Sequence, residues 1–153
     1  MKRILILTAA FTLLFVQSVF GAGAMTGGAD PWVPIGDTGI YYKTVTFTDD
    51  TTGTTGTITM GTNIALFGAW IYCATTDPGT TAPTDNYDIV VSKANGVDVF
   101  GGNLMNRDTA NTETAFPASG YEVLDGNLTF TLSNNAVNNA TGTLTIYALS
   151  NKE

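Results

Sequence analysis

The chain has 153 residues, with 13 acidic and 6 basic side chains and a formal net charge of −7. It contains no histidine and one cysteine, which excludes the usual general base, the histidine-dependent nucleophiles, a typical zinc site and an internal disulfide. The scattered basic residues argue against binding to nucleic-acid phosphates or to an anionic membrane surface. We therefore predict that the protein is not an enzyme and needs no cofactor.

Residues 1–24 have the layout of a secretory signal peptide. Lys2 and Arg3 precede an apolar run over residues 4–16, which is shorter than the about 20 residues of a membrane-spanning helix. Small residues follow in the order Ala-Gly-Ala and end at Ala24, a pattern that signal peptidases cleave. We predict cleavage after Ala24, export from the cell or incorporation into a virion, and no stable membrane anchor in the mature protein.

The mature chain is predicted to consist of a leader and one domain. Residues 25–38 contain two prolines and no clear period, so we expect a flexible leader. Residues 39–153 have the usual size of a single domain. Trp32, in the leader, is the aromatic residue that we would test first for stacking on a sugar.

The domain is rich in Thr, Gly, Asn and β-branched residues, a composition that favours strands and turns over helices. Short apolar or alternating runs, bounded by turn-forming residues, predict strands. These runs cover residues 40–48, 57–60, 63–73, 87–92, 97–100, 128–133 and 143–149. The most hydrophobic run contains Cys73, which we expect to be a buried and unreactive thiol. Asn95-Gly96 predicts a tight hairpin turn, because both residues tolerate a positive φ.

The number and spacing of these runs predict the fold class. Seven or eight short strands separated by turns indicate an all-β protein, a single antiparallel β-sandwich of jelly-roll type. In the run 128–133, strict alternation predicts that Leu128, Phe130 and Leu132 face the core. We find no internal repeat and no second domain.

The stretch NRDTANTETAFP, residues 106–117, differs from the rest of the chain because charged side chains gather there. Asp108 and Asn111 are residues that hydrogen-bond to nearby backbone amides in turns. Arg107 can form a forked pair with one carboxylate. The candidate partners are Asp85, Asp88 and Asp98. We predict that such a pair locks this loop onto the segment 83–88.

Two kinds of ligand remain open from the residue types. Calcium binds carboxylate and amide oxygens, although no segment has the spacing of a helix-loop-helix calcium loop. The calcium candidates are Asp85, Asp88, Asp98 and Asp108. A glycan would need exposed aromatic side chains, but most aromatic residues fall in predicted strands, where core packing is their usual role.

Residues 82–117 resemble a group of small β-rich hypothetical or structural proteins encoded by tailed phages and prophages. The shared sequences are Pro-Thr-Asp-Asn-Tyr-Asp at 83–88, Gly-x-Asp-Val-x-Gly-Gly at 96–102 and Asn-Arg-Asp-Thr-Ala-Asn-Thr-Glu at 106–113. The resemblance covers about a quarter of the chain, implies a structural role in a virion, and brings no catalytic residues. The positions singled out in and beside these motifs are Pro83, Asp85, Tyr87, Asp88, Asn95, Gly96, Asp98, Gly101, Gly102, Asn106, Arg107, Asp108, Asn111 and Glu113.

Three hypotheses for function follow. The first is a non-enzymatic structural protein, phage-associated or exported, that acts through assembly contacts with protein partners or with itself. The second is a secreted module that binds a glycan or another surface ligand through loops at one end of the sandwich. The third is an extracellular fibre subunit that pairs an exposed edge strand with its neighbour.

Overall fold

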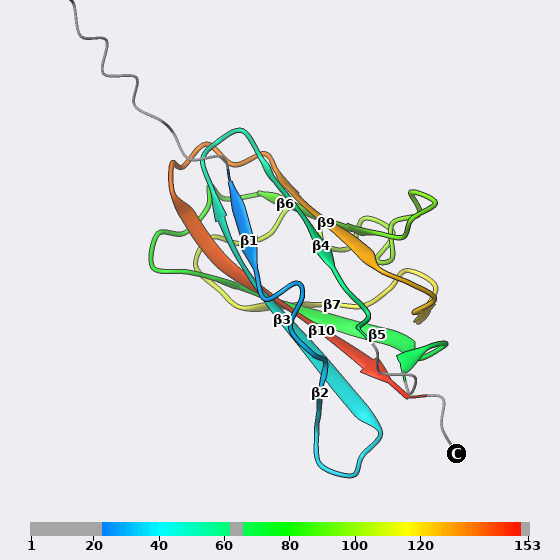
Figure 1. The fold of residues 1–153 in the computed structure, drawn as a ribbon. Helices are drawn as coiled ribbons and strands as arrows, with labels where there is room; N and C mark the ends of the chain where they lie inside the picture. The colour runs from blue at the N-terminus through cyan, green and yellow to red at the C-terminus, as the bar shows by residue number, and fades with distance from the viewer. Residues whose placement is uncertain (1–22, 62–65, 151–153) are drawn as a thin grey trace, which may run out of the picture.

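The computed structural model describes residues 23–61 and 66–150, which form two antiparallel sheets packed face to face (Figure 1). The predicted all-β sandwich is therefore confirmed. The strands of the larger sheet are β1 (Ala24–Thr26), β2 (Val33–Pro34), β3 (Ile40–Asp49), β5 (Trp70–Pro78), β7 (Glu113–Ala115), β8 (Glu122–Val123) and β10 (Ala140–Leu149). The smaller sheet contains β4 (Thr54–Ile58), β6 (Asp88–Ser92) and β9 (Leu128–Ser133). The predicted signal peptide lies almost entirely outside the described residues.

The strand order follows from one long hairpin that is wound around the sandwich. In the larger sheet, β10 lies between β3 and β5, and β5 also pairs with β7 and β8. In the smaller sheet, β9 lies between β4 and β6. β3, β4 and β5 thus pair in reverse order with β10, β9 and β8, as in the winding of a jelly roll, while β6 pairs with β9.

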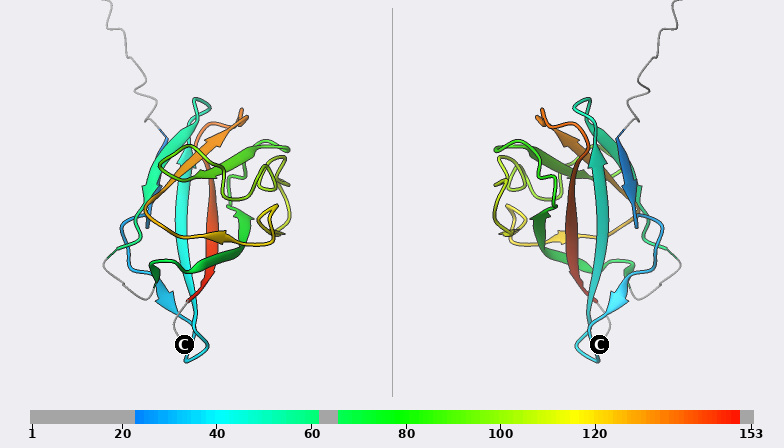
Figure 2. Two further views of the ribbon diagram at one scale, coloured as in Figure 1. Left: turned by 90° about the vertical axis from the view of Figure 1, so that its right-hand side faces the viewer. Right: turned by 90° about the vertical axis from the view of Figure 1, so that its left-hand side faces the viewer.

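The core lies between the two sheets and is built by alternation. Leu128, Phe130 and Leu132 of β9 are buried, as their spacing predicts. In β10, Leu144 and Ile146 point into the same core while Thr143 and Thr145 face outward. The longest strands, β3 and β10, pair over ten positions. Figure 2 shows them running along the whole domain, with the β2–β3 turn beyond one end.

Several strand boundaries differ from the prediction. β5 continues to Pro78, beyond the run 63–73 that predicts this strand, because β10 offers a hydrogen-bonding partner along that length. The second arm of the predicted hairpin, residues 97–100, is not a strand and pairs with β6 only through the isolated bridge between Ser92 and Asp98. β7 lies within the stretch 106–117, where no strand is expected.

The segment predicted as a flexible leader, residues 25–38, is packed onto the domain in the structure. It contributes β1 and β2, both of which pair with β3. Trp32 is only 4% exposed, and its Nε1–H donates to the Thr59 carbonyl oxygen at 3.2 Å, so it is not free to stack on a sugar. Lys43 is also buried, and its ammonium group donates a hydrogen bond to the Asp30 carbonyl oxygen. Burial of the apolar Trp32 side chain holds this segment on the domain, although the segment contains two prolines.

Candidate functional site

The stretch 106–117 forms a self-bonded loop that ends in β7. Asp108 Oδ1 accepts hydrogen bonds from the backbone amides of Ala110 at 2.5 Å and Asn111 at 2.8 Å. These bonds hold the pKa of Asp108 below its usual value, the Ala110 amide contributing most. Glu113 Oε2 in turn accepts the Asp108 amide at 2.7 Å. The acidic side chains of this loop are thus engaged in shaping it.

The structure pairs Arg107 differently from the prediction. The three carboxylates predicted as its partners are Asp85, Asp88 and Asp98. Instead, Arg107 Nε and Nη2 donate to the Met105 carbonyl oxygen at 3.2 and 3.0 Å. Its Nη1 lies 3.5 Å from Glu113 Oε2. The predicted partner is wrong because a backbone acceptor two residues away offers the guanidinium fork a local bond that costs little ordering of the chain.

The loop nevertheless lies against the segment 83–88, through other contacts. The Asn86 amide donates to the Arg107 carbonyl oxygen at 2.9 Å, and the Arg107 amide donates to the Tyr87 carbonyl oxygen at 2.8 Å. Thr109 Oγ1 donates to the Pro83 carbonyl oxygen at 2.6 Å. Main-chain bonds and one hydroxyl therefore make the contact that the sequence assigned to an ion pair.

Asp88 joins three separate parts of the chain. Its Oδ1 accepts the amide of Asn106 at 2.8 Å, and its Oδ2 accepts the side-chain amide of Asn134. Both asparagines have a positive φ, which asparagine tolerates better than most residues. Asp88 is buried, so these bonds replace the water that its carboxylate loses.

The glycines and the remaining motif residues form tight turns. Asn95 Oδ1 accepts the amide two residues later, and Gly96 has φ +82°, so the predicted hairpin turn is present. Asp98 accepts amides from Phe100 and Gly102 at 3.0 and 2.7 Å. Two more left-handed residues, Gly101 and Gly102, follow in this turn. The Asp85 carboxylate accepts a long hydrogen bond of 3.4 Å from the Asn86 side-chain amide.

The calcium candidates are not gathered into one site in the described structure. Residues 23–61 and 66–150 contain no group of three or more His, Cys, Asp or Glu side chains placed to hold a metal ion. Asp88, Asp98 and Asp108 each bond to a different set of backbone amides. What these carboxylates share is a structural role in separate turns.

Sequence reasoning missed the most buried polar contact of the domain. Asp49, at the end of β3, is fully buried. Its Oδ1 accepts Thr54 Oγ1–H at 2.9 Å and its Oδ2 accepts the Asn135 side-chain amide at 2.7 Å. Asn135 Oδ1 also accepts the Thr84 amide at 3.0 Å. A turn between β3 and β4 is thereby fastened to the turns before β6 and β10, although an Asp-Asp pair in a polar loop gives no sequence signal for this.

Tyr87, one of the motif residues, lies wholly inside the core. Burial raises its pKa to about 12, and the charge of Glu113 acts in the same direction. Its hydroxyl faces that of Thr76, but neither forms a hydrogen bond of regular geometry. A phenol held neutral in this way is unsuited to proton transfer near neutral pH.

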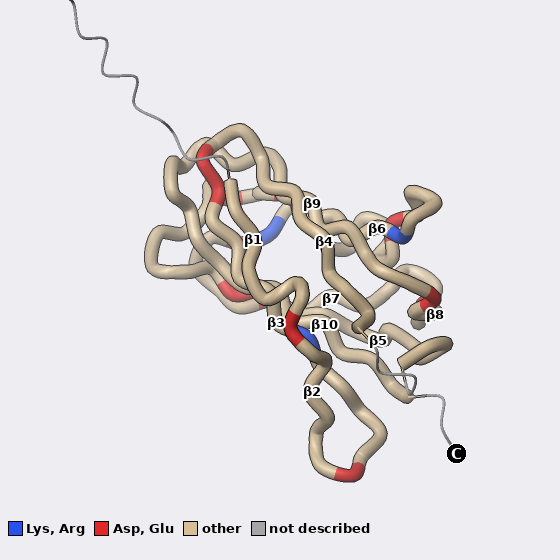
Figure 3. Tube along the Cα trace, viewed as in Figure 1, with Lys and Arg blue, Asp and Glu red and all other residues tan. Residues whose placement is uncertain are grey.

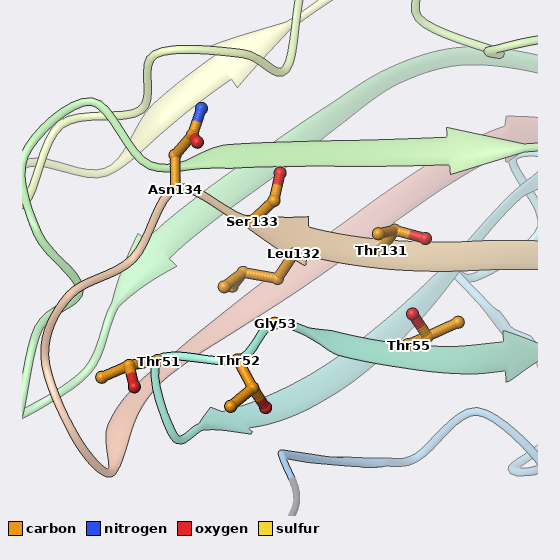
Figure 4. Close-up of a pocket in the computed structure, with 8 residues that line it drawn as sticks. All are labelled: Thr51, Thr52, Gly53, Thr55, Thr131, Leu132, Ser133 and Asn134. Atoms are coloured by element: carbon orange, nitrogen blue, oxygen red, sulfur yellow. The ribbon is translucent and has the colours of Figure 1, made fainter.

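Two open surface pockets accompany these turns. One, of about 240 Å³, lies beside β4 and β9 and is lined by hydroxyl, amide and aliphatic side chains without any ionisable group (Figure 4). The other, of about 230 Å³, contains Lys93 and Asp125, whose charged atoms lie 3.7 Å apart. Lys93 also pairs with Glu122 at 2.5 Å. Neither pocket brings a nucleophile together with a base.

The outer face of the larger sheet carries almost no charge. Figure 3 shows that acidic and basic residues occupy mainly loops and strand ends. Among the outward positions of the described strands in this sheet, Asp77 is the one charged residue. Toward Asp49 this face is covered by threonines, among which Thr44 and Thr145 share a hydroxyl bond of 2.8 Å. Threonine is the common outward residue of strands.

The opposite half of this outer face is aromatic and aliphatic. The register aligns Val33, Tyr42 and Tyr147 in one row, and Leu149 with Trp70 in the next. The rings of Trp70 and Tyr121 stack with their centres 5.0 Å apart, and these side chains are 42% and 51% exposed. We name this surface the aromatic face. It comprises Val33, Ile40, Tyr42, Trp70, Tyr121, Tyr147 and Leu149.

Cys73 lies on the outer side of the same sheet, opposite Tyr147, because a bulge adds one residue to β5 at this point. The thiol is buried, as predicted. Burial raises its pKa, and a hydrogen bond with Tyr72 opposes this rise. The thiol is therefore largely protonated near neutral pH, which makes it a poor nucleophile.

The chain matches no protein-family model, and comparisons with curated proteins and with solved structures found no similar protein. Within the described residues, no helix has the length and apolar character needed to cross a membrane. In the described residues, the polar side chains of the motifs bond within the chain, whereas the aromatic face is exposed to solvent.

Proposed function

We propose that the protein is a non-enzymatic structural subunit, exported or carried in a phage particle, that assembles with further copies of itself through the aromatic face. The observation that carries this proposal is the exposure of Trp70, Tyr121 and Leu149 side by side, on the half of the sheet where the outward positions of the described strands carry no charged side chain. Contiguous exposed apolar surface on a soluble protein is typical of a binding interface. Tyrosine and tryptophan are the residues enriched at its centre.

The charge distribution supports a second copy as the partner. With a net charge of −7, two copies repel each other at most relative orientations. The aromatic face lets them approach without bringing carboxylates together, and it spans several strands of one sheet. The resemblance of residues 82–117 to phage-encoded structural proteins suggests the same kind of role.

Sedimentation analysis of the purified protein over a wide concentration range tests the proposal. The unchanged chain should associate at high concentration, and the double variant Trp70→Ser/Tyr121→Ser should weaken this association at least tenfold, because the largest apolar surfaces at the contact are lost. Val97→Ser is the matched control. Val97 is 48% exposed but lies outside the aromatic face, so its loss should leave association unchanged.

Equal association of all three proteins would refute assembly through this surface. A separate measurement addresses the virion: mass spectra of purified particles should contain the chain if it is a particle subunit. Particles without it, together with self-association in solution, would retain the assembly proposal and limit it to an exported protein.

A glycan ligand is the second candidate, favoured by the same stacked pair, because a sugar ring can pack its C–H face on an exposed aromatic ring. A glycan array tested with the unchanged chain and with Tyr121→Ser distinguishes the two candidates. Binding that needs Tyr121 and competes with self-association would favour the glycan. A fibre built by strand addition has less support, because the outer strands β1 and β7 of the larger sheet have only three residues each.

A further inference from the structure

We infer that the exported chain begins at Ala22 or Gly23 and therefore keeps Gly23. The new terminal ammonium group then lies beside Asp50 and Asp49. This inference rests on the export assumed in the proposed function. It differs from the cleavage after Ala24 that the small-residue pattern alone predicts.

The first observation is that the backbone around Ala24 belongs to the sheet. In β1, Ala24 pairs with Thr48, and Met25 pairs with Phe47. Met25 packs against the core. Cleavage after Ala24 would remove the first pair and place a charged ammonium at Met25, next to this apolar contact. Burying a charge without a partner is costly, so the fold disfavours a terminus there.

The second observation is the tight fit of Gly23. A Cβ atom at this position would lie 2.0 Å from Thr54 Oγ1 and 3.1 Å from Asp49 Oδ1. Thr54 cannot simply turn away, because its hydroxyl donates to Asp49 and to the Thr48 carbonyl oxygen. The fold therefore has a place shaped for a glycine at residue 23, one residue before β1 begins.

The third observation is the unbalanced charge at this place. Asp49 is fully buried and Asp50 is 7% exposed. Among the described basic side chains, Lys93 and Arg107 form ion pairs with other carboxylates, and Lys43 donates to the Asp30 carbonyl oxygen. Asp50 accepts hydrogen bonds from the Thr52 hydroxyl and amide. These bonds do most to lower the pKa of the Asp50 carboxyl, and the nearby Gly23 amide acts in the same direction. A terminal ammonium at Gly23, or one residue earlier, would supply the positive charge that this neighbourhood lacks.

The sequence leaves room for such a cleavage. Small residues run without interruption from Gly21 to Ala24, so the chain offers more than one bond with a small residue before it. The A-x-A-like pattern is complete only for a cut after Gly23 or Ala24, whereas a cut that keeps Gly23 has Val19 or Phe20 at the third position before it. The inference of an earlier cut therefore depends on the fit of Gly23 in the fold.

The test begins with the full chain expressed with its own N-terminal segment in a secreting host. N-terminal sequencing and intact mass of the exported protein should show a start at Ala22 or Gly23. A start at Ala24 or Met25 would overturn the inference while leaving export and assembly intact. An uncleaved chain would overturn the inference together with export.

The variant Gly23→Ala gives an independent result. If Gly23 is retained, the added methyl group collides with Thr54, so the exported variant should be heavier by one methylene and should melt at a lower temperature. If the residue is removed with the signal peptide, the exported variant and the unchanged protein are the same molecule, and equal masses and melting temperatures would refute the inference.

The variant Asp50→Asn tests the position of the ammonium. A nearby carboxylate raises the pKa of an α-amino group above its usual value of about 7.7–8.0. Titration of that group by NMR should therefore give a lower pKa in Asp50→Asn than in the unchanged exported protein. Equal pKa values would place the terminus away from Asp50 and contradict the inference.

Discussion

At the end of the sandwich where β3 turns into β4, Asp49 and Asn135 are buried and bonded to each other. At the opposite end, where β5 begins, Trp70 and Tyr121 are about half exposed and stack on each other. At the first end, the polar side chains are costly to bury, and each forms hydrogen bonds within the chain. At the second end, the apolar side chains would be stabilised by burial but remain about half exposed to solvent. We name these two regions the polar end and the aromatic end.

The difference teaches which residues are available for function. At the polar end, carboxylates and amides already hold loops together, so a ligand would have to displace internal bonds. At the aromatic end, a partner gains apolar contact without breaking any bond of the fold. Stability should therefore depend most on the polar end, and self-association should depend most on the aromatic end.

The largest loss of stability is expected for Asp49→Ala. The substitution removes the carboxylate that accepts hydrogen bonds from the Asn135 amide and the Thr54 hydroxyl, and hydrogen bonds to a charged group contribute about 1.5–3 kcal/mol each. The two donors keep only the neutral carbonyl oxygens of Val137 and Thr48 as acceptors. We expect the free energy of unfolding to fall by about 3 kcal/mol, measured by chemical denaturation near neutral pH.

Asp37→Ala serves as the control, since Asp37 is exposed in the turn between β2 and β3, and surface substitutions usually change stability by less than about 0.5 kcal/mol. Similar losses for both variants would break the comparison, because they would show that the bonds of Asp49 contribute no more than a solvated carboxylate does. Self-association of the folded fraction should be the same for both.

The second prediction concerns alkaline pH and Tyr87. Its pKa is about 12 in the fold and about 10 in an unfolded chain. Since the folded-state pKa is raised, the stability that the neutral phenol contributes is complete below pH 10 and is lost between pH 10 and 12. The loss is about 1.4 kcal/mol per pH unit. Tyr87→Phe, measured by denaturation across this range, should show a shallower decline and near-unchanged stability at pH 7. An identical decline would mean that Tyr87 ionises freely.

A residual alkaline decline is expected in Tyr87→Phe, because burial also raises the pKa of the Tyr72 phenol.

The sandwich could be predicted from the sequence because alternation is a local signal. The pattern of Leu128, Phe130 and Leu132 fixes which face of β9 is buried, whatever the rest of the chain does. The extension of β5 to Pro78 could not be predicted in this way. It depends on pairing with β10, which is more than sixty residues away in sequence, and no local pattern records the presence of such a neighbour.

The candidate sites were harder to predict, for a related physical reason. The rare charges around Arg107 attract attention in the sequence, but nearby backbone groups can satisfy them, and they do so. The aromatic face arises only when residues from β2, β3, β5 and β10 come side by side in the sheet. Trp70 sits in a strongly apolar run, where core packing is the default expectation, so its exposure could be learned only from the register.

The smallest expected effect is that of Arg107→Ala, which decides whether the polar end has any function beyond stability. The guanidinium bonds to one carbonyl oxygen and lies 3.5 Å from Glu113, and the two side chains are 13% and 32% exposed. Ion pairs near the surface contribute about 0–1 kcal/mol. We expect stability to fall by about 1 kcal/mol and self-association to stay unchanged. Arg107→Lys keeps the charge but loses the forked donor geometry, so its stability should fall nearly as far. A fully stable Arg107→Ala that no longer associates would move the binding surface to the polar end, and the division between the two ends would have to be abandoned.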